Sequence, residues 1–501
     1  MQNYEIEATW HYHNGTKHPN GMLLNRFHVY HPSHRPAPYK IYKDVPQVSI
    51  PLDKTPIGIS ALDAISMENK YSHTIPDLGV LGRILYFSSG ITKKIKFQGL
   101  GEIDFRAASC TGALYHIEIY IICKDISGLE AGVYHFDPKH MKLDTIRLGD
   151  FRKFVSNATA EEQFTSQAPV ILVFTDVFSR NSIKYQSREY RHAFWDSGTI
   201  LANTLAITSA HKIPSKAITG FVDSKICQLL GLSISKEAPI AIIPIGQTVQ
   251  EAPAFPPLQE INIEAVSSDY EIEYPEINAM NESSCLLTEA EVASWRRQIT
   301  LEEKHSARLI PLGKNITVQE PLEKTIIRRG STRKFSLEPI TFDQLSTILN
   351  HATSKTNADF ASQKSLSDIY IIANAVDGLE SGSYYFVKEK NSLEQLRKGN
   401  FRHASGNLGL DQDLPYDASV TIFFMSNLDK ILGHFGNRGY RVAQIDAAIT
   451  GGKMYLASYA LGLGATGLTF YDDLVTNFFS PHAENRETMF LMAIGKKEKT
   501  T

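Results

Sequence analysis

The distribution of hydrophobic positions predicts a chain that mixes helices and strands. Two long stretches, residues 193–210 and 443–461, carry alanine and other apolar residues at helical spacing, which predicts buried central helices. Three shorter runs are apolar and rich in β-branched residues, as strands are: Ile117 to Cys123, Val133 to Phe136 and Pro169 to Phe174. The glycine-bounded connection between the first two predicts a hairpin. We therefore predict an α+β fold with a central helix.

The chain also repeats itself at an offset of 250 residues. Residues 119–138 align without gaps to residues 369–388 and share Ile-Tyr-Ile-Ile and Gly-Leu-Glu. The same offset places seven further positions on one another: Arg188 on Arg438, Tyr190 on Tyr440, Arg191 on Arg441, Ala193 on Ala443, Asp196 on Asp446, Phe221 on Tyr471 and Asp223 on Asp473. With a small shift from this offset, Ala8-x-Trp10 also corresponds to Ala293-x-Trp295. Such a long repeat predicts two copies of one domain.

Prolines and acidic residues separate the two copies. Residues 248–285 contain four prolines and several glutamates, and because proline fixes φ while like charges repel, this segment is expected to be an extended linker. The expected organisation is domain 1 at 1–247, the linker at 248–285 and domain 2 at 286–501.

Composition narrows the class of protein. The chain has 501 residues, 43% hydrophobic and 21% charged, which is typical of globular domains, and its net charge of -3 argues against nucleic-acid binding. Its four cysteines form no CxxC pair, so disulfides are not expected and a reducing cytoplasm fits. The N-terminal segment lacks the pattern of a signal peptide, and no run reaches the roughly 18 apolar residues of a membrane helix.

A cluster of cations stands late in the chain, ahead of the apolar run 342–349. Residues 326–335 contain Arg328, Arg329, Ser331 and Arg333. Guanidinium groups beside a hydroxyl and free backbone N–H groups near a helix start would bind a phosphate, because guanidinium pairs with phosphate oxygens through two charged hydrogen bonds. The alternative is an ordinary solvated surface. The site interpretation predicts a phosphorylated cofactor.

Together these stretches resemble the FMN-dependent nitroreductase fold, and within it the peptide azoline dehydrogenases. Arg328 to Arg333 is similar to the phosphate-binding element of that family. Arg106 to Tyr115 resembles its flavin-ring loop, and Lys184-Tyr185 its catalytic region. The resemblance implies two tandem nitroreductase-like domains that pack as a pseudo-dimer within the chain, FMN as cofactor, and oxidation of a thiazoline or oxazoline ring in a peptide, with a cyclodehydratase as a possible partner.

Each copy has one of the two flavin-binding elements and lacks the other. Domain 2 has no glycine between Gly330 and Gly378, so it lacks a counterpart of the ring loop, whereas the corresponding part of domain 1 upstream of Ile84 has no arginine. His434-Phe435 stands where domain 1 has Lys184-Tyr185. Since flavins of this fold lie at the dimer interface, the resemblance predicts one composite FMN site and one vestigial site. The cofactor-binding residues expected in the composite site are Arg328, Arg329, Ser331, Arg333, Arg106, Cys110, Thr111, Gly112, Ala465, Thr466, Gly467 and Lys496.

Lys184 and Tyr185 are the expected catalytic residues, as base and proton-holding partner. A lysine acts as a base only when neutral, which requires burial or a nearby cation to lower its pKa. Two other functions stay open: an NAD(P)H-dependent nitro or quinone reductase, and a degenerate scaffold or peptide-binding protein. Cys110 could instead be a reactive thiol, although no paired base is apparent in the sequence.

Two further sequence patterns do not predict a binding site of the kind they suggest. Gly462 to Gly467 has the form GxGxxG, but a helical run precedes it, so a dinucleotide fingerprint, which needs a preceding strand, is not expected. Six histidines lie near the N-terminus: His11, His13, His18, His28, His31 and His34. No carboxylate or cysteine falls among them at ligand spacing, and no metal is expected.

Overall fold

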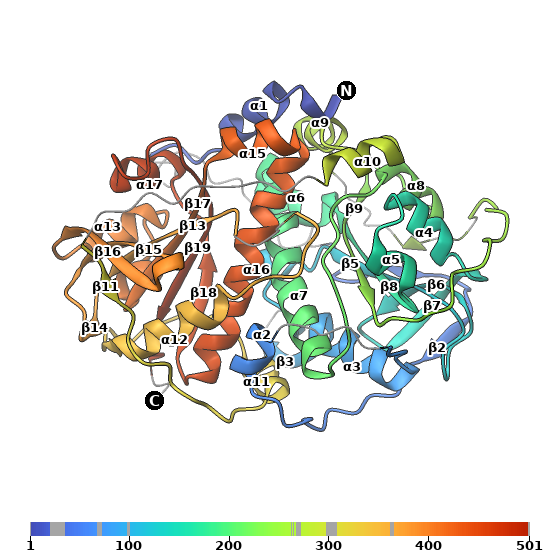
Figure 1. Cartoon of the computed structure of the whole chain (residues 1–501), viewed down its shortest axis with the longest axis horizontal. Coiled ribbons are helices and arrows are strands. Elements are labelled where there is room, and N and C mark those ends of the chain that lie inside the picture. Colours follow the sequence, from blue (N-terminus) through green and yellow to red (C-terminus); the bar gives the residue numbers. More distant parts are fainter. Residues whose placement is uncertain are drawn as a thin grey trace.

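Two β-sheets lie on opposite sides of a central pair of long helices in the computed structural model (Figure 1). The structure describes residues 2–20, 36–67, 73–97, 101–261, 263, 265–266, 272–296, 308–360 and 365–498. The central helices are α7 (Glu189–Ala210) and α16 (Arg438–Ala460), and nearly every residue of both is buried. The two central helices predicted from the sequence are therefore confirmed.

The first sheet is antiparallel, with the strand order β2-β7-β6-β5-β8-β9. Its strands are β2 (Gln47–Ser49), β5 (Ile117–Cys123), β6 (Gly132–Asp137), β7 (Lys142–Leu148), β8 (Val170–Val177) and β9 (Glu237–Ile245). β5 and β6 form the predicted hairpin, in which Tyr120 is opposite His135. A separate hairpin, β3 (Ile91–Phe97) and β4 (Gly101–Arg106), leads to the predicted ring loop.

The second sheet repeats the first, with the order β11-β16-β15-β13-β17-β19-β18. Its strands are β11 (Ile310–Pro311), β13 (Asp368–Ala373), β15 (Gly382–Val387), β16 (Ser392–Lys398), β17 (Val420–Ser426), β18 (Gly464–Leu468) and β19 (Glu487–Gly495). Two short pairs complete the strands: β1 (Ile41–Tyr42) with β10 (Ala265–Val266), and β12 (Ile340–Thr341) with β14 (Val376–Asp377). The strand at the additional edge, β18, directly follows α16, so the GxGxxG motif spans a helix-to-strand connection, as expected.

Apart from α10, the remaining helices also occur in matching positions. Those of the first copy are α1 (Glu7–Gly15), α2 (Ala61–Ser66), α3 (Leu78–Ser89), α4 (Arg152–Ala158), α5 (Gln163–Gln167), α6 (Phe178–Tyr185) and α8 (Asp223–Leu230). Those that follow are α9 (Pro275–Ser283), α10 (Glu289–Trp295), α11 (Leu322–Arg328), α12 (Phe342–Ala352), α13 (Arg402–Leu408), α14 (Asp413–Asp417), α15 (Leu428–Phe435) and α17 (Asp472–Phe479).

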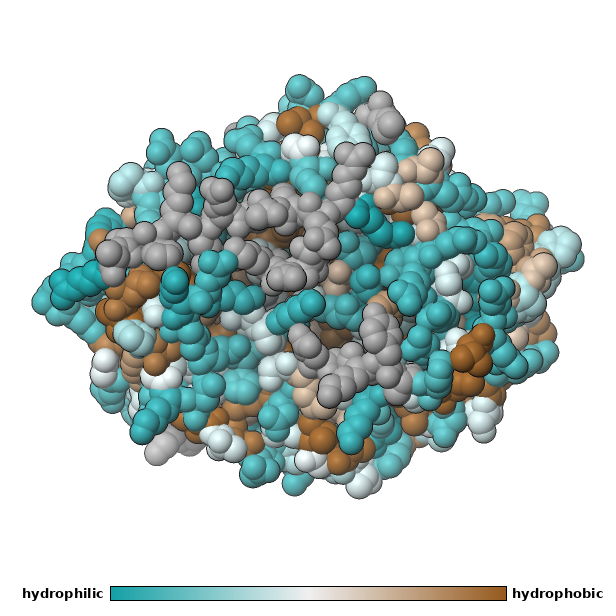
Figure 2. Space-filling model, in the orientation of Figure 1, coloured by the Kyte–Doolittle hydropathy of each residue, from teal (hydrophilic) through white to brown (hydrophobic). Residues whose placement is uncertain are grey.

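The face shown in Figure 2 is mostly hydrophilic, with hydrophobic residues scattered over it. Among the residues that the structure describes, no helix has both the length and the apolar character needed to cross a membrane.

Small residues let the two central helices approach closely. A Cβ atom added to Gly198 would lie 2.4 Å from Cβ of Ala448, and one added to Gly452 would lie 2.5 Å from Cβ of Ala202. Positions 198 and 448 are equivalent in the repeat, and so are 202 and 452. Each position therefore faces its own counterpart, as it would across the two-fold axis of a dimer. The pseudo-dimer within one chain is confirmed.

Replacing Gly198 with alanine is expected to lower the free energy of unfolding by about 1–3 kcal/mol, because the new methyl group overpacks the helix crossing. Thermal or urea denaturation would measure the change. Gly433→Ala is the matched control: its helical position has nothing within 4 Å of an added Cβ, so stability should stay the same or rise slightly. Equal melting temperatures for Gly198→Ala and the wild type would contradict this packing.

The two copies exchange buried ion pairs across their interface. Arg188 and Arg191 of the first copy donate to Asp472 at 3.1 and 2.6 Å. Arg438 and Arg441 of the second copy donate to Asp223 at 2.7 and 2.9 Å. All six side chains are buried, so each arginine pair depends on a carboxylate of the other copy.

Asp472→Asn is expected to destabilise the protein at pH 7 by about 3–5 kcal/mol, because it leaves two buried guanidinium groups without their counter-charge. Burial alone would raise the pKa of Asp472, but Arg188 and Arg191 outweigh burial and hold that pKa well below its usual range. This depressed pKa stabilises the fold above the pKa of the unfolded state, and the stabilisation is lost as pH falls through the folded value. Denaturation at several pH values should therefore show the variant and the wild type converging in acid; a constant difference would contradict the ion-pair account.

Two details of the predicted repeat are wrong. The residue equivalent to Asp223 in the second copy is Asp472, not Asp473, because Asp223 and Asp472 are each the first residue of their helix. Asp473 instead contacts Lys17 at 2.8 Å. The counterpart of α1 is α9 rather than the segment around Trp295: Thr16, after α1, accepts from Arg191 as Ser284, after α9, accepts from Arg441.

The end of the predicted linker is likewise not extended. Residues 275–283 form α9, with Ile277, Met280 and Asn281 buried, because the proline at its first turn is compatible with a helix start. Upstream, most of the described part of residues 248–274 lacks regular structure, as predicted, apart from the short β10.

Candidate functional site at the interface of the two copies

Four cations gather on the second copy between α11, β18 and the end of β19. Arg328 ends α11 and donates to the carbonyl of Tyr459 at 2.5 Å. Arg329, Arg333 and Lys497 complete this set, which we call the cation cluster. Lys497 lies over the ring of Tyr459 at 4.6 Å, and burial together with the nearby charge of Arg328 lowers the pKa of Lys497. Arg328 also pairs with Glu320 at 3.5 Å, so the cluster keeps a positive excess that favours binding of an anion.

The cation cluster does not lie at a helix start, as the sequence had suggested. Arg328 is in the last turn of α11, and α12 begins only at Phe342. The end of α11 exposes carbonyl groups, which disfavour an anion. Any phosphate bound here would therefore depend on side-chain cations and on the hydroxyl of Ser331, which lies 3.2 Å from that of Tyr455.

β18 places Ala465, Thr466 and Gly467 beside the cation cluster. The N–H of Thr332 donates to the carbonyl of Ala465 at 2.9 Å, which ties the segment after α11 to this strand. The N–H of Gly467 donates to the hydroxyl of Tyr455 at 2.5 Å. The three predicted residues are thus next to the predicted phosphate-binding residues, although in this structure Tyr455 already binds the N–H of Gly467.

The predicted ring loop of the first copy is held by one carboxylate of the central helix α7. Asp196 accepts from the N–H of Thr111 at 2.8 Å, from its hydroxyl at 3.0 Å and from Sγ of Cys110 at 3.1 Å. Gly112 has a φ of 63°, which favours glycine, and a Cβ there would lie 2.9 Å from the hydroxyl of Tyr185. Asp196 fixes the loop, and Gly112 lets it approach Tyr185.

A buried histidine, His116, lies beneath this loop and was not predicted as a site residue. It contacts Asp176 at 2.6 Å and Asp196 at 2.7 Å. Burial by itself would lower the pKa of His116, but Asp176 and Asp196 outweigh burial and raise it well above its usual value. Burial and Asp176 also raise the pKa of the neighbouring Glu189. The repeat of Asp196 at Asp446 was the sequence signal for this anchor: Asp446 binds the N–H of Leu366 in the second copy at 2.8 Å.

His116 also bears on whether Cys110 is a reactive thiol. Although no paired base was apparent in the sequence, His116 is close enough to bond to the thiol. Burial and Asp196 nevertheless raise the pKa of Cys110, which keeps it a thiol rather than a nucleophilic thiolate.

Lys184 and Tyr185 end α6 at the edge of the ring loop. The ammonium of Lys184 lies 5.1 Å from the centroid of the Tyr185 ring, and Lys184 is exposed. Burial, Asp196 and Cys110 raise the pKa of Tyr185, while Arg333 and His116 oppose them. Tyr185 is therefore a neutral phenol at physiological pH, available to donate a hydrogen bond.

The two halves of the predicted site meet directly. Arg329 of the second copy donates to the carbonyl groups of Ala107 and Arg106 of the first copy at 3.0 and 3.1 Å. Arg333 is near enough to Tyr185 to influence its pKa. The structure thus brings cations of the second copy to the ring loop and catalytic pair predicted in the first.

Two of the expected binding residues face elsewhere. The guanidinium of Arg106 is buried against Tyr39 and Tyr115 and donates to the carbonyl of Pro38 at 2.6 Å, so only its backbone faces Arg329. Lys496 contacts Glu338 at 3.1 Å, whereas its neighbour Lys497 belongs to the cation cluster.

The histidines near the N-terminus have separate surroundings. His13 is buried between Tyr440 and Glu487, at 3.2 and 3.0 Å. The backbone of His18 donates to Asp472 at 2.9 Å. His28, His31 and His34 lie outside the described residues.

The donor set suits the phosphate and ring of a flavin mononucleotide. Arg333 makes no ion pair with a carboxylate among the described residues, and its side chain is exposed beside Tyr185. An uncompensated guanidinium, a second arginine and Ser331 offer the charged and neutral donors that a phosphate monoester binds. Gly112 and Gly467 lack a side chain, which would let a planar ring approach the backbone of either segment.

The fold and this interface define the class of protein: the chain belongs to the nitroreductase family, whose sequence model matches residues 74–247 and 326–496. Among solved structures, a protein designated a nitroreductase from Anabaena variabilis has the same fold over 98% of this chain and 99% of its own, with a TM-score of 0.77 and 23% identity.

Three curated proteins illustrate the relationship in sequence. A protein designated nitroreductase MJ1384 of Methanocaldococcus jannaschii is 24% identical over 34% of this chain and 80% of its own length. The trifolitoxin-processing protein TfxB of Rhizobium leguminosarum is 29% identical over 34% of this chain and 47% of its own. The microcin B17-processing protein McbC of Escherichia coli is 23% identical over 26% of this chain and 50% of its own. This chain thus matches about half of each processing protein.

Proposed function

We propose that this protein is an FMN-dependent oxidoreductase that dehydrogenates an azoline-like ring derived from a peptide. The observation that carries the proposal is the composite site: Arg329 of the second copy donates to the carbonyl of Ala107 in the ring loop of the first, and Arg333 is near enough to Tyr185 to influence its pKa. Family membership supports an oxidoreductase, and the sequence relationship to TfxB and McbC supports a peptide-derived substrate.

Each part of the proposed site has a separate role in binding. Arg328, Arg329, Ser331, Arg333 and Lys497 would hold the phosphate. On the first copy, Cys110, Thr111 and Gly112 would bind the ring, with Asp196 holding their loop in place; on the second, Ala465, Thr466 and Gly467 of β18 would contribute backbone groups. When bound, FMN would accept the hydride, one hydrogen with two electrons, that the substrate ring loses.

Lys184 and Tyr185 would act on the proton that the substrate ring loses. Nζ of Lys184 would take a proton from a carbon of the substrate ring, and the hydroxyl of Tyr185 would hold the developing charge by a hydrogen bond. Because Lys184 is exposed here, a bound substrate would have to cover it, and the nearby cations would then favour its neutral form. An enzyme that makes such rings, a cyclodehydratase, is the partner that this reaction requires upstream.

The test begins with the visible absorbance of the purified protein, which gives the ratio of FMN to chain. We expect one FMN per chain and, under anaerobic conditions, bleaching of the flavin by a thiazoline- or oxazoline-containing peptide together with loss of two hydrogens by mass spectrometry. Rapid bleaching by NAD(P)H without peptide would favour a nitro or quinone reductase. A colourless protein that FMN does not reconstitute would favour a scaffold and overturn the proposal.

A further inference from the structure

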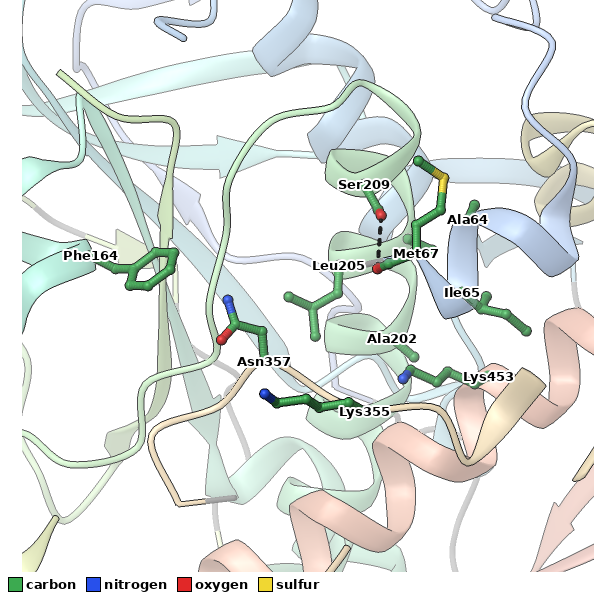
Figure 3. Close-up of a pocket in the computed structure, with 11 residues that line it drawn as sticks. Ala64, Ile65, Met67, Phe164, Ala202, Leu205, Ser209, Lys355, Asn357 and Lys453 are labelled. Carbon is green, nitrogen blue, oxygen red and sulfur yellow. Dashed lines mark hydrogen bonds between the residues drawn. The ribbon is translucent and has the colours of Figure 1, made fainter. Parts of the chain in front are cut away.

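A cavity lies between the two copies, beside the central helices α7 and α16. Its volume is about 240 Å³, below the roughly 300–1,000 Å³ of pockets for drug-sized ligands, so it suits a smaller molecule. The described residues that line it come from α2, the α5 segment, α7, the connection after α12, and α16: Ala64, Ile65, Met67, Phe164, Ala202, Leu205, Ala206, Ser209, Lys355, Asn357 and Lys453 (Figure 3).

The repeat explains why this space exists. At the offset of 250 residues, Leu205 and Ser209 correspond to Tyr455 and Tyr459, which face the segment 329–332 in the composite site. The cavity is therefore the counterpart of that site across the pseudo-two-fold axis. Where two tyrosines stand in one site, a leucine and a serine stand in the other, and the smaller side chains leave room.

The counterpart has lost the phosphate-binding residues. After α2 the sequence contains no arginine until Arg83, which pairs with Glu323 at 2.8 Å and with the carbonyl of Asp53 at 2.8 Å. Without those guanidinium groups an FMN phosphate would lack its charged partners.

One buried cation has appeared instead. Lys453 takes the place of Asn203 in the repeat and is only 4% exposed. Its ammonium donates to the carbonyl and the hydroxyl of Ser354 at 3.1 and 3.4 Å and to the hydroxyl of Thr356 at 3.2 Å, all of them neutral acceptors. Among the described residues it forms no ion pair with a carboxylate, although burying a charge without a counter-charge is costly. A ligand anion would supply that counter-charge.

The opposite wall is apolar. Ile65, Ala202, Leu205 and Ala206 line it, and Figure 3 shows the amino groups of Lys355 and Lys453 and the side chain of Leu205 gathered around one space. We propose that this cavity binds a small organic carboxylate with an apolar body, the carboxylate at Lys453 and Lys355 and the body against Leu205 and its neighbours.

The charge of Lys453 makes such binding depend on pH. Burial and the cation Lys388 lower the pKa of Lys453 to about 7, and Asp446 opposes them. Lys355, at the exposed rim of the cavity, adds positive charge. A carboxylate binds the protonated ammonium, so affinity should be full below the pKa of free Lys453 and should fall as pH rises above it, with proton uptake on binding near pH 7.

The experiment uses the full chain as purified, with its FMN content recorded, and isothermal titration calorimetry with octanoate and 4-phenylbutyrate. Octanamide is the neutral control ligand. Lys453→Met removes the charge at similar volume, and Ser209→Tyr refills the cavity with the side chain that its counterpart carries. Lys390→Met, at an exposed position of the second copy, is the matched control variant.

We expect one carboxylate per chain, at least tenfold weaker binding by Lys453→Met, no binding by Ser209→Tyr, and unchanged binding by Lys390→Met. Wild-type affinity should be higher at pH 6 than at pH 8. Equal binding of octanoate and octanamide, unchanged binding by Lys453→Met, or no binding by the folded wild type would overturn the proposal. A second FMN per chain that octanoate does not displace would also overturn the proposal. The FMN content of the composite site is read separately, so failure of one proposal leaves the other standing.

Discussion

Replacing Arg328 and Arg333 together by alanine should leave the purified protein almost free of FMN. Each charged hydrogen bond to a phosphate is worth roughly 1.5–3 kcal/mol, so two lost contacts cost roughly 3–6 kcal/mol and weaken binding by about 100-fold to 20,000-fold. The measurement is the flavin absorbance of the purified variant, followed by titration of the apoprotein with FMN. Arg333→Ala alone should show about half of this free-energy change, since Arg333 has no carboxylate partner among the described residues.

The matched control is Lys390→Ala/Lys398→Ala, which also removes two exposed cations from the second copy. We expect it to retain FMN, because both residues lie around β16, away from the cation cluster. If both double variants lost FMN equally, general electrostatic attraction rather than the composite site would explain binding. If neither lost it, the phosphate would lie elsewhere.

The second large effect is expected at the pair Lys184-Tyr185. Lys184→Met and Tyr185→Phe should each lower kcat for dehydrogenation of an azoline peptide by about 100-fold to 10,000-fold, the usual contribution of a positioned acid or base. FMN content should remain unchanged, because neither side chain belongs to the proposed phosphate site. Stopped-flow measurement of flavin reduction under anaerobic conditions would separate the chemical step from product release.

His434→Gln is the matched control for this pair, since His434-Phe435 occupies the equivalent turn of α15 in the second copy. Its activity should equal that of the wild type if only one site is catalytic. Full activity of both Lys184→Met and Tyr185→Phe would remove the pair from the mechanism. Comparable losses at His434 would instead mean that the two ends of the pseudo-dimer act together.

The sequence predicted much of the fold because the fold repeats. The offset of 250 residues and the long apolar runs identified α7 and α16. The β-branched runs identified β5 and β6 nearly to the residue, and β8 except for its last three residues. These predictions succeed because hydrophobic periodicity reports which face of an element is buried. Prediction failed where local pattern and packing diverge. The helix α9 lies in a segment rich in proline and charge, yet one face of it is buried because it covers Arg441 as α1 covers Arg191.

The candidate site shows the same division. Residue types alone marked the cations after α11 as a candidate phosphate site, whereas the glycine-containing ring loop and Lys184-Tyr185 were marked by their resemblance to nitroreductase-fold motifs. The chain pattern could not show that Asp196 holds the ring loop, that His116 lies between two carboxylates, or that Arg106 turns inward while Lys497 rather than Lys496 joins the cation cluster. These depend on distances between segments far apart in the chain.

By itself, then, the sequence determined that the chain is two copies of one α+β domain and that each copy lacks what the other keeps. Only the tertiary structure decided how the copies complete one another. Gly198 and Gly452 let the central helices cross closely, and the exchanged ion pairs of Asp472 and Asp223 fix the orientation of the copies. That geometry brings Arg333 to Tyr185 at one end and leaves Lys453 in a cavity at the other, because a contact between distant segments is set by packing and not by local pattern.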